Sequence, residues 1–271
     1  MPNFICVTCG TQYLESASPP EHCPICEDER QYIGHNGQQW TTLEDLRAER
    51  ANLFRQLEPN LTGIGSEPRF AIGQRALLIQ TPAENVLWDC ISLIDEATVE
   101  RINALGGLTA IAISHPHFYS SMVAWSEAFG GLPIYLHADN RPYVQRPAAQ
   151  IQYWDSETFP LGDGLTLIRC GGHFAGSTVL HWAAGADGRG ALLTGDTIQI
   201  VADRRYVSFM YSYPNMIPLR ASAVRRIAAA VGPFAFDRIY NGWYENVVDT
   251  DGNAAVKRSA ERYIAAIEDV N

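Results

Sequence analysis

Four cysteines in two C-x-x-C pairs constrain the start of this chain more than any other feature. Cys6 and Cys9 form the first pair, Cys23 and Cys26 form the second, and thirteen residues separate the pairs. Two such turns can place four thiolates at the corners of a tetrahedron, which suits Zn²⁺ or iron. The alternative is disulfide pairing, which is disfavoured in a reducing compartment. The spacing therefore predicts a four-cysteine metal site.

The cysteine-rich segment resembles the short rubredoxin-like domain of rubrerythrins. The resemblance rests on Phe4–Gly10, Pro20–Cys26 and Gln31–Ile33. It identifies the ligands and leaves two metals open, because iron would imply electron transfer and zinc a structural role. A segment this small has little core, so the metal would supply most of its folding energy. We expect a ribbon over residues 1–40 that binds zinc, with iron as the alternative, and we expect His22 to be a solvated neighbour of the site.

Residues 41–68 are expected to connect this ribbon to the rest of the chain. Thr41 and Glu44 have the spacing of a capping box before an apolar stripe, which predicts a helix over residues 41–54. The stretch Pro59–Pro68 is rich in glycine and proline and is typical of a linker. We therefore place the main domain at residues 69–271.

From residue 69 onward, short apolar runs bounded by turn residues alternate with amphipathic segments. This alternation predicts the strands and helices of a layered α/β sandwich. Strands are expected at 75–80, 86–90, 108–114, 133–137 and 237–240, and strands dominate 152–200. Helices are expected at 96–105, 121–129, 219–231 and 253–267.

Three histidines and one aspartate lie in turns that follow expected strands. His115 and His117 follow one strand with a single residue between them, so both imidazoles can turn toward one point. His173 and Asp196 each lie in a glycine-rich turn after another apolar strand. Functional groups are commonly carried on loops at the ends of rigid strands. We interpret these four residues as candidate metal ligands.

The order of these motifs resembles that of the metallo-β-lactamase superfamily. Its core motif H-x-H-x-D-H is followed by a G-H-x-x-G-S histidine, a G-D aspartate and a late histidine. The resemblance covers residues 69–245, and Asp89 matches an aspartate at the end of an early strand. It implies an αββα four-layer sandwich. It also implies a first metal bound by the three matching histidines, with an aspartate that can bridge two metals: His115, His117, His173 and Asp196.

Three ligands that hold the second metal in that superfamily are missing here. Tyr119 stands at the aspartate position of the core motif and Ser120 at its last histidine. The late histidine is absent, and Asn241 stands close to its place. One carboxylate with neutral groups would poorly offset the dehydration of a second divalent ion. We expect one metal ion in the main domain.

Three functions are compatible with this reduced ligand set. Three histidines with an open position suit Zn²⁺ and imply hydrolysis of an ester, thioester, lactone or amide. Asp196 would then orient water or accept its proton, and Tyr119 would donate to a developing oxyanion or only fill space. Alternatively, His115, His173 and Asp196 form a two-histidine, one-carboxylate face that suits Fe²⁺ and oxygen, as in persulfide dioxygenases of the same superfamily. The third function is ligand binding without catalysis.

Several other residues are expected to have structural or surface roles. Buried positions are expected for His137, His181, Cys90 and Cys170, and an exposed one for His35. The aromatic stretch 204–214 is compatible with a pocket lining, with interior packing or with a dimer face.

Charge and hydropathy limit the partners and the location. The formal net charge is −10, and Lys257 is the only lysine among 20 basic residues. Because these residues form no basic stripe, nucleic acid is disfavoured and a small-molecule substrate is favoured. Apolar runs are too short to cross a bilayer, and no secretory signal pattern is present. We therefore expect a cytoplasmic protein without a membrane partner, either monomeric or a homodimer.

Overall fold

The computed structural model describes residues 1–268, which fall into two compact units. Of the described residues, the first unit contains 1–136 and 141–153, and the second contains 137–140 and 154–268. Within the described residues, every helix is too short or too polar to cross a lipid bilayer.

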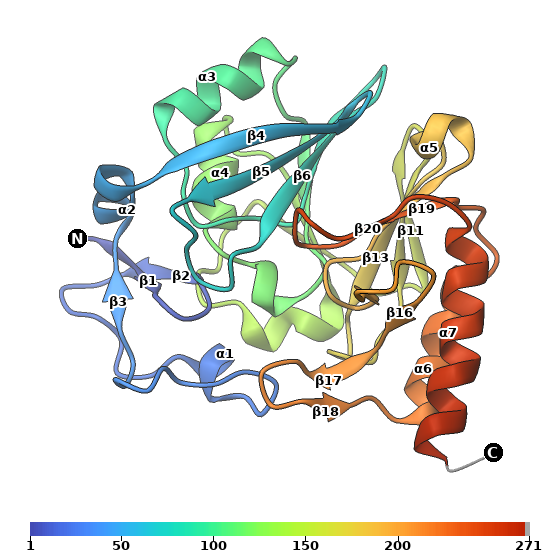
Figure 1. Cartoon of the computed structure of the whole chain (residues 1–271). Helices are drawn as coiled ribbons and strands as arrows, with labels where there is room; N and C mark the ends of the chain where they lie inside the picture. The colour runs from blue at the N-terminus through green and yellow to red at the C-terminus, as the bar shows by residue number, and fades with distance from the viewer. Residues whose placement is uncertain (269–271) are drawn as a thin grey trace. The chain divides into compact units, whose positions relative to one another are not determined.

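The cysteine-rich start of the first unit is built on a small antiparallel sheet (Figure 1). Its strand order is β2-β1-β3, with bounds Gln12–Glu15, Asn3–Cys6 and Trp40–Thr41. A single helical turn, α1 (Pro24–Glu27), carries the last cysteine. The apolar cluster around the cysteines is small, and Tyr13, Ile25 and Trp40 belong to it.

A seven-stranded sheet forms the rest of the first unit, in the order β10-β9-β8-β7-β6-β5-β4. The strands β4 to β7 are antiparallel, whereas β7, β8 and β9 are parallel. The bounds are β4 Ala51–Glu58, β5 Leu61–Glu67, β6 Arg75–Gln80, β7 Asn85–Trp88, β8 Ala110–Ala112, β9 Ile134–His137 and β10 Ile151–Trp154. The helices are α2 Leu43–Glu49, α3 Glu96–Ala104 and α4 Met122–Ala128, with a 3₁₀ turn at Pro116–Phe118. A second 3₁₀ turn, Ala138–Tyr143, begins in residues assigned to the second unit.

The expectations for residues 41–68 are wrong in two respects. The helix ends at Glu49 rather than near residue 54, and its capping box joins Thr42 to Asp45 rather than Thr41 to Glu44. The supposed linker contains β5, which pairs with β4 on one side and β6 on the other. Glycine in this stretch indicates a sheet interior rather than a flexible connection, because most of β5 is buried. The domain boundary itself stays a prediction.

The second unit contains a six-stranded sheet in the order β11-β12-β13-β14-β19-β20. Only the β14–β19 pairing is parallel. The strand bounds are β11 Thr158–Gly162, β12 Leu165–Arg169, β13 Thr178–Trp182, β14 Ala191–Leu193, β19 Arg238–Tyr240 and β20 Val247–Val248. Two small hairpins comprise β15 Gln199–Ile200 with β16 Val207–Ser208, and β17 Met210–Ser212 with β18 Ile217–Pro218.

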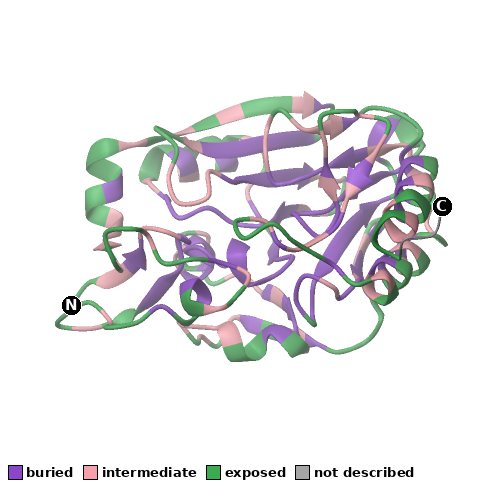
Figure 2. Cartoon of the chain, turned by 60° about the horizontal axis from the view of Figure 1, so that its bottom comes forward, coloured by how far each residue is buried: buried purple, intermediate pink, exposed green. Residues whose placement is uncertain are grey.

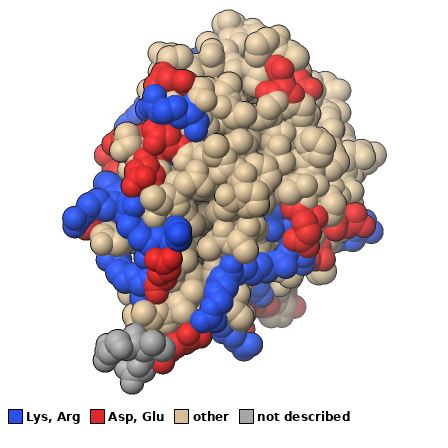
Figure 3. Space-filling view, turned by 90° about the vertical axis from the view of Figure 1, so that its right-hand side faces the viewer, with Lys and Arg blue, Asp and Glu red and all other residues tan. Residues whose placement is uncertain are grey.

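Helices α6 (Ala221–Val231) and α7 (Gly252–Ile267) lie side by side in the second unit, and α5 (Gly185–Gly188) is a short turn (Figure 1). The inward faces of α6 and α7 join the apolar core of this unit, and Val224 and Ala255 are fully buried there. Figure 2 shows mostly buried strands and helices with exposed outer faces, as expected for amphipathic helices that cover a sheet. On the face drawn in Figure 3, basic and acidic side chains lie next to one another.

The main-domain pattern predicted from the sequence is confirmed. The helices expected at 96–105, 121–129, 219–231 and 253–267 correspond to α3, α4, α6 and α7 within two residues at each end. The strand at 75–80 is confirmed at both ends as β6. The chain is thus an α/β protein with several sheets and an N-terminal four-cysteine ribbon.

Candidate metal centres

The four ribbon cysteines lie together, as the sequence predicts. All four are buried, and their sulfur atoms lie within 4.8 Å of one another. The Sγ atoms of Cys6 and Cys26 are 3.5 Å apart, and those of Cys9 and Cys23 are 3.7 Å apart. Hydrogen bonds from Cys23 and Cys26 lower the pKa of the Cys6 thiol, which favours the thiolate. A compact buried set of four sulfur donors fits Zn²⁺ or iron.

The first candidate histidine pair lies in the first unit, in the loop after β8. His115 and His117 flank Pro116 at the start of a 3₁₀ turn, and both side chains are buried. Their ring centroids are 5.2 Å apart. Burial, with the nearby charge of Arg30, lowers the pKa of His115 to about 3, so its imidazole is neutral as a metal ligand must be.

Asp89 and Ser114 hold this histidine loop at its beginning. Asp89 has a left-handed backbone conformation (φ 60°), and its Oδ1 accepts a 2.8 Å hydrogen bond from the Ser114 amide. The Ser114 hydroxyl lies 3.0 Å from Nδ1 of His115. Asp89 thus has the structural role beside the histidine loop that its position in the sequence suggests.

The second candidate pair lies in the second unit. Nε2 of His173 is 3.8 Å from Oδ1 of Asp196, and both side chains are almost completely buried. Nδ1 of His173 lies 3.2 Å from the Met210 carbonyl oxygen. Because a carbonyl only accepts, Nδ1 carries the proton and the lone pair is on Nε2, next to the carboxylate. This pair offers one imidazole nitrogen and one carboxylate oxygen on adjacent loops.

Tyr213 supports both members of the second pair. Its hydroxyl donates a 2.6 Å hydrogen bond to the Asp196 backbone carbonyl, and its ring centroid lies 5.8 Å from that of His173. Burial, together with the charge of Asp196, raises the pKa of Tyr213 well above its usual value, so the phenol remains a donor. The sequence gives no signal for Tyr213 beyond its place in the aromatic stretch 204–214.

The turn that carries His173 is clamped by Asn140. The side-chain Nδ2 of Asn140 donates to the backbone carbonyl of Gly176 at 3.0 Å, and its Oδ1 accepts from the backbone N–H of Gly176 at 3.1 Å. A Cβ atom at residue 176 would lie 2.8 Å from this amide and 2.9 Å from Nδ1 of His137. His137 is therefore a buried support of the turn, as expected for a core histidine.

Asn241 supports the aspartate loop from the place where a late histidine is missing. Its side chain is buried and donates to Oε1 of Gln199 at 3.1 Å. The neighbouring Gly242 amide donates to the Gly195 carbonyl, directly before Asp196. Residues 241–242 thus contact the loop that carries Asp196, but they offer no imidazole as a metal ligand.

Tyr119 and Ser120 follow the first histidine pair and are both buried. Burial raises the pKa of Tyr119 well above its usual value, so its phenol stays protonated. The Ser120 hydroxyl donates to the Cys90 carbonyl at 3.2 Å and accepts from Nε2 of Gln74 at 3.0 Å. Ser120 therefore fixes the end of the histidine loop.

The residues expected to have structural or surface roles have them. His181 is buried, and its Nε2 lies 2.8 Å from the Ala235 carbonyl. His35 and His22 are exposed. Cys90 and Cys170 are fully buried, and burial raises the pKa of the Cys170 thiol to about 12, so neither is an activated thiol.

The aromatic stretch 204–214 packs mainly into the interior of the second unit. Val207 and Phe209 are buried in its apolar core, and the Val207 amide donates to the Ser259 hydroxyl of α7. Arg262 lies over the Tyr206 ring at 3.7 Å. Of the interpretations open from the sequence, interior packing is the one that these contacts confirm.

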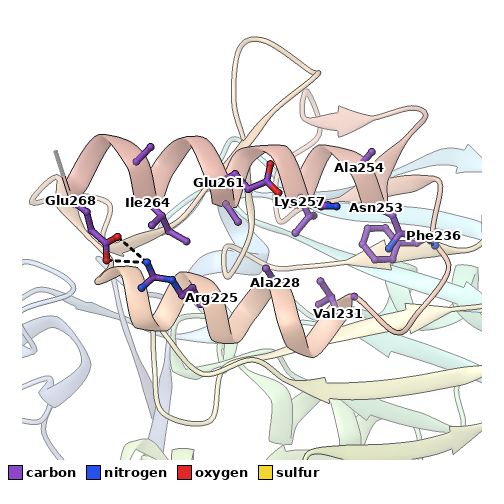
Figure 4. Close-up of a pocket in the computed structure, with 14 residues that line it drawn as sticks. Arg225, Ala228, Val231, Phe236, Asn253, Ala254, Lys257, Glu261, Ile264 and Glu268 are labelled. Atoms are coloured by element: carbon purple, nitrogen blue, oxygen red, sulfur yellow. Dashed lines mark hydrogen bonds and ion pairs between the residues drawn. The ribbon is translucent and has the colours of Figure 1, made fainter. Parts of the chain in front are cut away.

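A pocket of about 840 Å³ lies between α6 and α7 of the second unit (Figure 4). Its walls are largely apolar and include Ala228, Val231 and Ile264. At one end Arg225 pairs with Glu268 at 2.8 Å, as the dashed lines show. None of the residues that line it is a candidate metal ligand.

Comparison with solved structures identifies the class of fold. The metallo-β-lactamase DIM-1 aligns with a TM-score of 0.58 and 15% identity, over 80% of this chain and 100% of the other. A B3 metallo-β-lactamase with an active-site glutamic acid aligns at 0.54 and 15%, over 85% and 97%. VMB-1 aligns at 0.60 and 16%, over 80% and 98%. The protein therefore has the metallo-β-lactamase fold, to which the four-cysteine ribbon is added.

Sequence comparison identifies the nearer relationship. The chain is 53% identical over 269 residues to the uncharacterised protein YmaE of Bacillus subtilis (strain 168), which spans 98% of this chain and 97% of that protein. The chain belongs to the YmaE family. No family model matches it.

Proposed function

We propose that the protein is a metal-dependent hydrolase with one zinc site. His115 and His117 form one half of the site, and His173 and Asp196 form the other. The observation that carries the proposal is the pairing of buried donors within each half, with Nε2 of His173 beside the Asp196 carboxylate at 3.8 Å. The similarity to metallo-β-lactamases supports a metal-dependent hydrolase.

The donor set fits a single divalent ion. Three imidazoles and one carboxylate suit Zn²⁺, with Fe²⁺ as the alternative. Ser120 occupies the place of a further ligand, but its hydroxyl is engaged by Gln74 and Cys90. A bound Zn²⁺ would supply Lewis-acid polarisation and lower the pKa of water.

The residues around the ion have separate roles in the proposed hydrolysis of an ester, thioester, lactone or amide. The Asp196 carboxylate orients the attacking water and accepts its proton. The Tyr119 phenol is kept protonated by burial and donates to the developing oxyanion. Tyr213 holds the Asp196 backbone, so the carboxylate stays in place as charge moves.

The function is tested by His173→Ala, with His181→Ala as the matched control. Both histidines are buried in the second unit, but His181 bonds to a backbone carbonyl away from the candidate ligands. We expect about two zinc ions per wild-type chain and per His181→Ala chain, and only the ribbon ion in His173→Ala, with hydrolysis of model esters and lactones lost. Full metal content in His173→Ala would contradict the ligand assignment, and iron at the histidines would identify the oxygenase alternative.

The same proposal includes a small-molecule substrate and a cytoplasmic location. The ribbon thiols bind metal only while they are reduced, and the cytoplasm keeps them so. All six cysteines of the chain are free thiols in the structure.

A further inference from the structure

Residues 10–12 of the ribbon contact two segments of the first unit: the histidine loop, through Gln12, and the loop after β7, through Gly10. The Gln12 amide donates a 2.9 Å hydrogen bond to the Ser120 carbonyl, three residues beyond His117. The Ser92 hydroxyl donates a 2.8 Å hydrogen bond to the Gly10 carbonyl. Both contacts lie within the first unit. The first joins the end of the first cysteine turn to the segment that carries two of the proposed main-domain ligands, and the second holds the same turn against the loop after β7.

The same three residues close the first cysteine turn. The Gly10 amide donates to the Cys6 carbonyl at 2.8 Å, and the Cys6 amide donates to the Thr11 carbonyl at 3.0 Å. Gly10 has a left-handed conformation (φ 81°), which a glycine adopts without strain. Because Cys6 and Cys9 would hold the ribbon metal, its binding would fix the turn that ends in residues 10–12.

Ser120 transmits this position to the histidine loop. It has a left-handed conformation (φ 44°), which is costly for a residue with a side chain and persists only where the surroundings enforce it. Its carbonyl is held by Gln12, and its hydroxyl is held by Gln74 and Cys90. The ribbon therefore supplies one of three polar contacts that fix this conformation.

Two side-chain contacts strengthen the attachment of the ribbon. Arg146 donates a 2.6 Å hydrogen bond to the Gln12 side chain and also pairs with Glu127 of α4. Arg30 donates to the Tyr143 hydroxyl at 3.0 Å. The ribbon is thus bound to the main sheet region by charged and neutral hydrogen bonds around the histidine loop.

We propose that the metal-bound ribbon positions the main-domain metal ligands, with Gly10, Gln12 and Ser92 as positioning residues that act through Ser120. This inference rests on the proposed function for the metal site at His115 and His117. Loss of the ribbon metal releases the Gly10–Gln12 segment, and the histidine loop then samples conformations that bind zinc poorly. Outer residues that orient ligands typically change metal affinity by about 10- to 100-fold.

The test is Gly10→Ala, with Gly37→Ala as the matched control. Both glycines lie in the ribbon with left-handed backbones, φ 81° and φ 79°, so the backbone penalty is the same. A Cβ atom at residue 10 would lie 2.6 Å from the Ser92 hydroxyl and 3.0 Å from Cβ of Ala71. A Cβ atom at residue 37 meets nothing within 4 Å. Only the first variant forces the ribbon turn away from Ser92 and Ala71, and with it the Gln12 amide that bonds to Ser120.

Three measurements are made on the full chain. Zinc affinity is measured against a competing chelator, amide exchange is followed over residues 114–122, and the cobalt-substituted protein gives absorption spectra. We expect Gly10→Ala to bind main-domain zinc about ten-fold more weakly and to exchange faster over residues 114–122 than Gly37→Ala. Its histidine-site cobalt bands should shift while the thiolate-to-cobalt bands stay in place, a pattern that general destabilisation would not produce.

Ser92→Ala provides a second variant that introduces no steric clash. It removes the hydrogen bond to Gly10 and is expected to move zinc affinity and amide exchange in the same direction by a smaller factor. Equal zinc affinity and equal exchange in Gly10→Ala and Gly37→Ala would overturn the inference. If the wild type holds zinc only in the ribbon, the proposed function fails, and the difference in exchange alone decides whether the ribbon positions the loop.

Discussion

A single backbone hydrogen bond sets the tautomer of His173. Its Nδ1 donates to the Met210 carbonyl, so Nε2 has its lone pair beside Asp196. The Met210 carbonyl, in the β17–β18 hairpin, thus leaves Nε2 as the ring nitrogen that can bind a cation. Metal-binding histidines commonly donate their other ring N–H to such an acceptor. In the first histidine pair, the Ser114 hydroxyl lies beside Nδ1 of His115, as the Met210 carbonyl lies beside Nδ1 of His173.

The order of motifs in the sequence singles out the candidate ligands but not their supports. His115, His117, His173 and Asp196 follow a recognisable pattern, and their role as ligands stays a prediction. Tyr213 and Asn140 have no such pattern, because they reach the site from loops whose position depends on long-range packing. Asp89 and Asn241 do have a signal, since Asp89 matches an aspartate of the superfamily pattern and Asn241 stands where a histidine is missing.

Replacing Asp89 should weaken the histidine loop. Asp89→Ala removes the acceptor of the Ser114 amide and places alanine at φ 60°. The expected loss is about 2 to 4 kcal/mol, from a left-handed alanine and an unsatisfied buried amide. Asp89→Asn keeps an acceptor oxygen and tolerates this backbone, so it should lose much less. Urea unfolding measures both, and equal losses in the two variants would contradict the assigned role.

The sequence predicts a helix or strand well when the residues of that element alone show its apolar pattern or its cap. Strand β6 and helix α3 are apolar or capped in ways that the sequence shows directly. Strands β4 and β5 were missed because their identity depends on pairing with each other, with Phe54 opposite Ile64. A glycine-containing strand that is buried by its neighbours has the local composition of a loop.

Close packing before β14 should make Gly190 much less replaceable than Gly188. Both have left-handed backbones, φ 86° and φ 82°, but a Cβ atom at residue 190 would lie 2.0 Å from the Ala235 carbonyl oxygen, and one at residue 188 meets nothing within 4 Å. Gly188→Ala should cost about 1 kcal/mol, and Gly190→Ala about 2 to 4 kcal/mol more, because backbone must move. Urea denaturation compares them. Similar urea midpoints for the two variants would show that residue 190 and the Ala235 carbonyl, next to β14 and β19, are packed less closely than described.

At the scale of the whole molecule, composition and motif order were sufficient to predict a metallo-β-lactamase fold behind a four-cysteine ribbon. They were not sufficient to predict what the ribbon contacts. The bond from the Gln12 amide to the Ser120 carbonyl joins two segments about a hundred residues apart and uses backbone atoms, which no side-chain pattern reveals. The inferred dependence of one metal site on the other therefore comes from the structure alone.

Anomalous diffraction at the zinc absorption edge, from crystals of the zinc-loaded protein, tests the central claim most directly. The account predicts two peaks per chain, one among the four ribbon sulfurs and one bound by nitrogen atoms of His115, His117 and His173 with the Asp196 carboxylate next to it. A single peak in the ribbon, or a second peak bound by only one of the two pairs, would contradict the proposed ligand set.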